Sequence, residues 1–223
     1  MMARIARLVI PGYPHHVTQR GNRRHPTFFC EEDYRVYIQL VATAKAAVGA
    51  EIWAYCLMPN HVHLVVVPAK ETSLAELFRD AHRRYTRKIN FREDWRGHLW
   101  QERFHSFVMD ERHLLAAIRY IELNPVRAKL CDQAGDWEWS SARAHLTAED
   151  DALVTVEPML QIIGDWESYL ACTEAQETIE TLRKRSRTGR PAGCPDFIRR
   201  MELLTGRSLL KQKSGPKSKQ TVK

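Results

Sequence analysis

The sequence has no apolar run near the roughly 20 residues that a membrane-spanning helix needs, so we expect no membrane partner. Its five cysteines are scattered and odd in number, which excludes a CxxC metal clamp and argues against a disulfide framework. Only about four apolar residues follow the first arginines, too few for a signal peptide. We therefore expect a protein of the reducing cytoplasm.

Charge is unevenly distributed along the 223 residues, whose net charge is +7. Residues 1–130 carry a net charge of +7, residues 131–182 a net charge of −11, and residues 183–223 a net charge of +11. A basic body and a strongly basic C-terminal segment favour a polyanionic partner, and the acidic middle could shield that segment. A soluble protein with a solvated charged tail has the same composition, so charge alone does not decide.

Hydrophobic periodicity predicts an alternation of strands and helices. The predicted elements are a strand within residues 4–20, a helix at 31–49, strands at 51–57 and 61–67, a helix at 73–91, a strand at 99–109 and a helix at 110–123. Ser73 and Asp110 are the expected N-caps of the last two helices, and Pro125 should end or kink the final one. This order predicts an α+β fold of the ferredoxin-like, split βαβ type, an antiparallel sheet with helices packed on it.

A helical C-terminal extension is expected beyond this unit, over residues 147–210, with an acidic part followed by a basic part. It should contain short helices near 157–163, 166–183 and 196–207, with a loop at 186–195. Residues 211–223 form a basic tail that we expect to be disordered.

His61 and His63 form an HxH pair in a predicted strand. Residues two apart on a strand share one face and lie about 6.5–7 Å apart, so the two imidazoles can converge on one cation. Cupins and metallo-hydrolases share this pattern, and a pair facing water on an edge strand would also produce it. No aspartate follows in the position that the HxHxDH pattern of binuclear hydrolases requires.

Tyr120 and Asn124 are four residues apart near the end of a predicted helix, which places them one turn apart on the same face. An amide oxygen can bind Mg²⁺ or Mn²⁺, and a phenol oxygen is a competent nucleophile near a cation. The alternative is structural: a tyrosine covering the core and an asparagine near the helix end.

Basic residues gather in a loop, on the second predicted helix and on the last predicted strand. Arginines interleaved with aromatic residues suit the phosphates and unpaired bases of a nucleic acid, although a solvated helix face is an alternative. The candidate DNA-binding residues are Arg20, Asn22, Arg23, Arg24, Arg83, Arg84, Arg87, Lys88, Arg103 and His105.

Four motifs in this order resemble the REP-associated tyrosine transposases, which are relatives of insertion-sequence transposases with an HUH histidine pair and one catalytic tyrosine. The motifs are GNRR, MPNHVHLVV, AIRYIELNPVRA and WEWSSARAH. The resemblance covers roughly residues 4–146, so residues 1–146 are the expected nuclease domain. A looser similarity continues through RTGRPAGCPDFIRRMELLTGR.

The resemblance implies metal-dependent cleavage and rejoining of single-stranded DNA at hairpin or repeat elements. It implies that His61, His63 and Asn124 bind a divalent metal, Mg²⁺ or Mn²⁺, and that Tyr120 forms a 5′-phosphotyrosine link. A domesticated, non-catalytic protein that recognises structured repeats is the main alternative, and a replication-initiator or relaxase nickase is a weaker one. The sequence leaves open whether the protein is a homodimer or a monomer.

Overall fold

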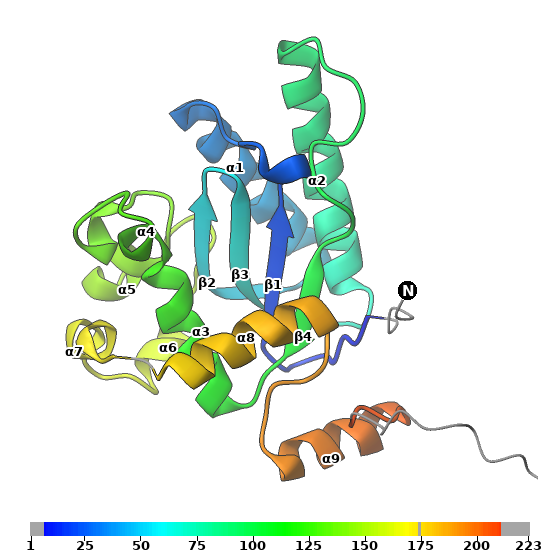
Figure 1. Cartoon of the computed structure of the whole chain (residues 1–223), viewed down its shortest axis with the longest axis vertical. Coiled ribbons are helices and arrows are strands. Elements are labelled where there is room, and N and C mark those ends of the chain that lie inside the picture. The colour runs from blue at the N-terminus through cyan, green and yellow to red at the C-terminus, as the bar shows by residue number, and fades with distance from the viewer. Residues whose placement is uncertain (1–6, 174, 211–223) are drawn as a thin grey trace, which may run out of the picture.

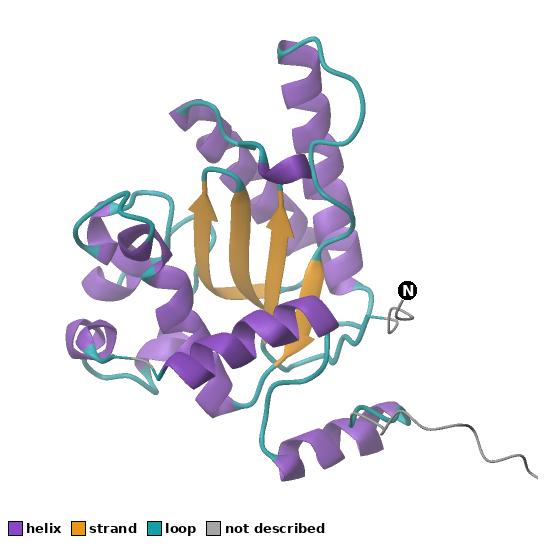
Figure 2. Cartoon of the chain, viewed as in Figure 1, coloured by secondary structure: helices purple, strands orange, loops and turns teal. Residues whose placement is uncertain are grey.

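The computed structural model describes residues 7–173 and 175–210, and within them four strands form one antiparallel sheet (Figures 1 and 2). The strand order is β2-β3-β1-β4. The strands are β1 (His15–Arg20), β2 (Glu51–Met58), β3 (His61–Val67) and β4 (His105–Val108). With helices α1 (Glu31–Val48) and α2 (Ser73–Arg92) between them, they follow the order of the split βαβ fold, which confirms the predicted fold class.

The alternation of β3 assigns its side chains to two different layers. Val62, Leu64 and Val66 belong to the apolar core that lies against α1 and α2. Val65 belongs instead to the core shared with α3 (Glu111–Glu122) on the opposite face. His61 and His63 share the parity of Val65, so the strand directs both imidazoles to the second face.

Of the three helix boundaries predicted from Gly49, Ser73 and Asp110, the structure confirms those at Gly49 and Asp110. Gly49 ends α1 in the left-handed conformation (φ 63°), and Asp110 caps α3 by accepting a 3.0 Å hydrogen bond from the His113 amide. The predicted cap at Ser73 is wrong. Ser73 is the first residue of α2, and its hydroxyl accepts from the Lys70 amide and donates to the Val48 carbonyl.

The strand predicted at 99–109 is much shorter than expected, because β4 begins only at His105. Glu102 adopts a positive φ of 58°, which interrupts an extended strand. Trp100 makes an isolated bridge to Gly21, so residues 97–104 form an irregular segment beside the end of β1. Arg103, expected on a strand, lies in this segment.

The helix of Tyr120 ends before Asn124, as the position of Pro125 predicted. Leu123 separates α3 from a short helix, α4 (Asn124–Arg127). Asn124 is therefore the first residue of a new helix and does not continue the helical face of Tyr120.

The C-terminal extension is helical, as predicted, with different boundaries. The 3-10 turn η2 (Ala134–Asp136) and helix α5 (Ala142–Thr147) precede it. Its helices are α6 (Glu157–Leu160), α7 (Trp166–Ala171), α8 (Gln176–Thr188) and α9 (Pro195–Thr205). The single helix predicted at 166–183 is two helices, and α8 runs on into the predicted loop until Gly189 ends it at φ 67°. The tail at 211–223 lies outside the described residues.

Helix α8 runs in front of the sheet, on the face opposite α1 and α2 (Figure 1). It contacts α3, β4 and β1. A 3-10 turn, η1 (Asn22–Arg24), follows β1 at the far end of the strand. In residues 7–173 and 175–210, no helix has the length and apolar character needed to cross a bilayer.

Candidate active site

A cavity of about 1160 Å³ lies on the sheet face that carries the HxH pair. Strand β3 contributes His61 and His63, and α3 contributes Tyr120. Strand β1 and the irregular segment supply its polar floor and rim, and α8 supplies its far wall. The remaining lining residues are Thr18, Gln19, Arg20, Arg24, Gln101, Glu102, His105, Leu182, Arg183, Ser186 and Arg187. The fold thus brings the histidine pair and the tyrosine into one cavity.

The rings of His61 and His63 are close together, with centroids 5.0 Å apart and planes nearly perpendicular. The ring of Tyr120 lies 5.9 Å from that of His63. A phosphate in this cavity can therefore reach the Tyr120 phenol and two imidazoles at once.

Hydrogen bonds hold both imidazoles by their Nδ1 atoms. His61 Nδ1 donates to Asn60 Oδ1 over 2.6 Å, which leaves His61 Nε2 with its lone pair available. His63 Nδ1 lies 2.9 Å from Nε2 of His16, a buried β1 residue whose ring stacks on His63. Such partners orient an imidazole and select its tautomer.

Burial keeps these rings uncharged. Burial, together with the positive charge of Arg20, lowers the pKa of His61 to about 4. Burial also lowers the pKa of His63 well below its ordinary value, and His16 has a pKa of about 3 for the same reason. Neutral imidazoles are the form that binds a metal ion.

Asn124, the expected third ligand, does not line this cavity. Its Oδ1 accepts a 3.1 Å hydrogen bond from Arg127, and its buried Nδ2 has no partner among the described residues. Within the described ranges, no group of three His, Cys, Asp or Glu side chains converges on a cation position. The two imidazoles fit a divalent cation, and Asn124 Oδ1, which accepts one hydrogen bond, keeps a second lone pair for such an ion.

Two guanidinium groups surround the tyrosine. Arg127 Cζ lies 4.4 Å and Arg183 Cζ 5.9 Å from the centre of the Tyr120 ring. With Arg20 and Arg24 on the opposite rim, they make the cavity strongly cationic. This environment suits a phosphodiester and stabilises negative charge at the tyrosine.

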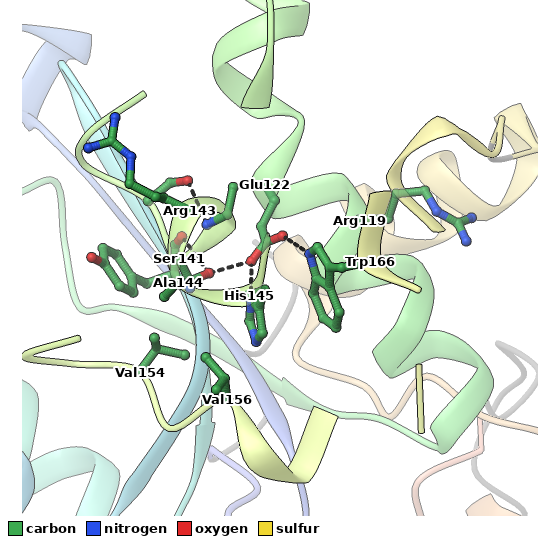
Figure 3. Close-up of polar contacts among 12 residues, drawn as sticks. Arg119, Glu122, Ser141, Arg143, Ala144, His145, Val154, Val156 and Trp166 are labelled. Atoms are coloured by element: carbon green, nitrogen blue, oxygen red, sulfur yellow. Dashed lines mark hydrogen bonds and ion pairs between the residues drawn. The ribbon is translucent and has the colours of Figure 1, made fainter. Parts of the chain in front are cut away.

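The end of α3 is anchored by the buried carboxylate of Glu122 (Figure 3). Glu122 accepts hydrogen bonds from Ser141 Oγ (2.5 Å), His145 Nδ1 (2.7 Å) and Trp166 Nε1 (2.8 Å). Ser141 is the N-cap residue of α5, His145 lies within α5, and Trp166 lies on α7. Three residues from two segments, α5 with its N-cap and α7, therefore fix the helix two positions after Tyr120.

Sequence reasoning missed the contribution of α8 and of two further residues, His16 and Arg127. Arg183, Ser186 and Arg187 line the cavity, and Arg127 and His16 contact its central side chains. The available signal is the basic run RKRSR at 183–187, which lies in the basic segment 183–223 that favours a polyanionic partner. Nothing in the sequence indicates that this run returns to the sheet.

The predicted DNA-binding residues fall into separate groups. Arg20, Arg24 and His105 line the main cavity. Asn22 and Arg23 line a pocket of about 220 Å³, and Arg83, Arg87 and Arg103 line a cavity beside α2. Arg84 and Lys88 line none of these cavities; Arg84 pairs with Asp80 at 3.5 Å and Lys88 with Glu32 at 3.9 Å.

Comparison with known families identifies this arrangement. The family described as "Transposase IS200 like" matches residues 11–124, just over half of the chain. The chain belongs to the IS200-like transposase family. The matched region ends at Asn124, so α8, which completes the cavity of this IS200-like transposase, lies outside it.

Two relatives place this transposase more closely. A "REP-associated tyrosine transposase" of Escherichia coli (strain K12) is 25% identical over 109 residues, which are 48% of this chain and 64% of the relative, so the chain spans less than two thirds of that protein. A solved structure described as a REP-associated tyrosine transposase bound to a REP hairpin has a TM-score of 0.57 at 20% identity. It covers 69% of this chain and 92% of its own, and it shows that the fold is shared.

Proposed function

We propose that this IS200-like transposase cleaves and rejoins single-stranded DNA at hairpin or repeat elements through a 5′-phosphotyrosine intermediate on Tyr120. The observation that carries the proposal is the single cationic cavity that contains Tyr120, His61 and His63. The family is a transposase family, and a solved structural relative is described as bound to a REP hairpin, which supports the class of DNA.

In the proposed reaction, Tyr120 Oη attacks the scissile phosphorus and the bond from phosphorus to the 3′ oxygen breaks. The leaving oxygen takes up a proton to become a 3′-hydroxyl, and the 5′ side stays joined to the tyrosine as a phosphodiester. A 3′-hydroxyl of another strand then attacks this phosphorus and releases the tyrosine. Because one phosphodiester replaces another at each step, no external energy source is needed.

The residues around Tyr120 divide the remaining tasks. Arg127 and Arg183 lie against its ring, where they attract the phosphate and stabilise negative charge during attack. His61 and His63, neutral at pH 7, would hold a divalent cation, Mg²⁺ or Mn²⁺, with an oxygen ligand from Asn124, DNA or water. When bound, that cation polarises the scissile phosphate. Asn60 and His16 orient the two imidazoles.

The deciding experiment follows a labelled single-stranded hairpin with unpaired flanks on a denaturing gel. We expect a covalent protein–DNA band with Mn²⁺ or Mg²⁺ that is absent with chelator and absent in Tyr120→Phe. Tyr13→Phe is the matched control, because Tyr13 packs against Phe197 and does not line the cavity. A band of undiminished intensity in Tyr120→Phe would show that another residue is the nucleophile.

A non-catalytic DNA-binding role is the second candidate, and one observation favours it. Asn124 is engaged by Arg127 and lies outside the cavity, so the third ligand position is not assembled. This role predicts tight binding of hairpin DNA that is indifferent to chelator and yields no covalent band with any divalent metal. The same gel, combined with an equilibrium binding assay, separates the two functions.

A further inference from the structure

A second cavity, of about 670 Å³, lies between α2 and the irregular segment 97–104. Tyr120, His61 and His63 do not line it. Its volume is within the range of roughly 300–1000 Å³ that is typical of small-ligand sites. None of the catalytic steps above uses it.

Aromatic rings form the floor of this cavity. Phe78 and Phe104 pack with centroids 4.8 Å apart, and His82 stacks on Trp100 at 4.6 Å. Burial lowers the pKa of His82 to about 3, so its ring is neutral and behaves as part of the aromatic surface. The Arg7 guanidinium covers the Phe104 ring at 3.5 Å, so the His82 and Trp100 rings are the part of the wall that suits a planar, π-rich ligand.

Trp100 also carries an unmet hydrogen-bond donor. The side chain is 6% exposed and lines the cavity, and its Nε1 has no partner in the part of the chain that the structure describes. A buried indole N–H without an acceptor is costly, because tryptophan normally bonds through this atom when buried. The Nε1 atom is shielded from solvent, so an acceptor such as a ring nitrogen or carbonyl of a nucleobase reaches it only if neighbouring side chains move.

Arginines surround this aromatic floor. Arg79, Arg83 and Arg87 lie along one side of α2, and Arg103 lies opposite them on the irregular segment. All four are exposed, and Arg83 pairs with Asp80 at 3.2 Å. Within residues 7–173 and 175–210, the other three form no ion pair, so their charges are available for phosphates.

The second cavity adjoins the main one. Gln19 and Glu102 line both. Gln19 Nε2 donates to the carbonyls of Gln101 and Glu102, each at 3.2 Å, and so holds the irregular segment against the end of β1. A DNA strand whose phosphate lies beside Tyr120 would therefore enter the second cavity by crossing this segment.

We propose that this second cavity, called here the α2 cavity, receives an unpaired base of the DNA strand whose phosphodiester lies at Tyr120. The phosphates on either side of that base would contact Arg79, Arg83, Arg87 and Arg103. The inference rests on the proposed function, since it extends the substrate of the same site. Bases within a duplex stem are stacked and paired, so they cannot reach the aromatic floor of this cavity without leaving the stack. The ligand is therefore a nucleotide of the single-stranded flank.

Photocrosslinking locates that base directly. Hairpin oligonucleotides carry 5-iododeoxyuridine at each unpaired flank position in turn, and tryptic peptides of the irradiated complex are mapped by mass spectrometry. We expect one flank position to crosslink to peptide 97–103, which contains Trp100, or to peptide 80–83, which contains His82. Crosslinks confined to other peptides at every position would overturn the inference.

Binding measurements test the two components of the site separately. An abasic site at the crosslinking position should weaken binding by about tenfold or more, and Trp100→Phe should largely remove this difference. Arg79→Gln/Arg103→Gln should lower the slope of log affinity against log salt by about 1.4, as two lost phosphate contacts on a single strand predict. Arg84→Gln is the control on the same helix, because Arg84 lines neither cavity.

The outcomes distinguish this inference from the proposed function. The arginine variants lie on the surface, so they test the site even if Trp100→Phe lowers stability, which a thermal melt reveals. Suppose that the Tyr120 adduct forms, that the double variant has an unchanged salt slope, and that no abasic position weakens binding. This result would leave the proposed function standing and reject the role of the α2 cavity. Equal binding by a blunt hairpin without flanks would also reject it. Failure of every oligonucleotide to bind would reject the proposed function itself.

Discussion

The indole N–H of Trp166 donates to Glu122 Oε2 over 2.8 Å, so a residue of the C-terminal extension binds a carboxylate only two positions after Tyr120. Ser141 and His145 bind the other oxygen. The helix that carries the proposed nucleophile is thereby tied to segments beyond the region that the family shares.

Removing this carboxylate should destabilise the protein strongly. Glu122→Ala leaves the buried donors of His145 and Trp166 without an acceptor, and leaves Ser141 only the Tyr55 carbonyl at 3.3 Å. It is expected to lower the free energy of unfolding by about 3 kcal/mol, and Trp166→Phe by about 1 kcal/mol. Urea denaturation provides the measurement. Glu138→Ala, at an exposed position, is the control and should change stability by less than about 0.5 kcal/mol. Equal stability of the two alanine variants would contradict the anchoring role.

The ion pair of Asp33 with Arg92 should contribute more to the free energy of unfolding than the other ion pairs of α1. Asp33 is fully buried, and its oxygens lie 2.5 and 3.0 Å from the Arg92 guanidinium. Asp33→Ala is expected to cost about 2 kcal/mol, because the Phe29 amide loses its acceptor and Arg92 keeps only its pair with Glu93. Glu31→Ala, which removes an exposed pair with Arg35, should cost less than about 0.5 kcal/mol in the same assay.

Stability should fall as the solution is acidified. Burial lowers the pKa of His15 to about 4 and that of His82 to about 3, whereas both ionise near 6.5 in the unfolded chain. The unfolded state therefore binds more protons below 6.5, and the free energy of unfolding decreases as the pH falls from there towards 4.

Asp33 extends the same trend to lower pH. Burial alone would raise its pKa, but hydrogen bonds from Arg92 and the Phe29 amide outweigh this and lower it, so its stabilisation is lost as the pH falls through the folded value. Urea midpoints across this range, with NMR titration of the histidine rings, are the test. A His82 ring that titrates near 6.5 in the folded protein would show that the ring is accessible to solvent and does not contribute to this pH dependence.

The arginines of α8 should contribute to DNA binding through phosphates. Arg183→Gln/Arg187→Gln is expected to lower the salt slope of single-stranded DNA binding by about 1.4 and to weaken binding at every sequence alike. Fluorescence anisotropy across a salt series measures both. Arg199→Gln/Arg200→Gln on α9 is the matched control, since neither residue lines the cavity. A change in sequence preference without a change in slope would contradict a phosphate role.

Asn60 should support the proposed cation through His61. Its Oδ1 accepts from His61 Nδ1 at 2.6 Å and so directs Nε2 to the cavity. Asn60→Ala is expected to weaken Mn²⁺ binding by about 10-fold to 100-fold, measured by isothermal titration calorimetry. Asn90→Ala, which loses only a bond to the Gly97 carbonyl, is the control. Identical Mn²⁺ affinity in both variants would exclude this orienting role.

Local sequence determined much of the fold. Apolar periodicity located α1, β2, β3 and α2, and Asp110, Gly49 and Pro125 predicted where α3 begins and where α1 and α3 end, because caps and breakers act within one helical turn. Alternation alone placed His61 and His63 on one face of β3. The motifs then supported the family, which the comparisons show.

Long-range packing decided what local patterns could not. Helix α8 returns to the sheet after more than fifty residues, and no periodicity within 183–187 indicates which cavity its arginines line. The positive φ of Glu102 cuts β4 short, and Asn124 begins a separate helix and does not line the cavity of Tyr120. Spacing along a chain specifies neighbours within an element, whereas contacts between elements depend on the free energy of the whole packed domain.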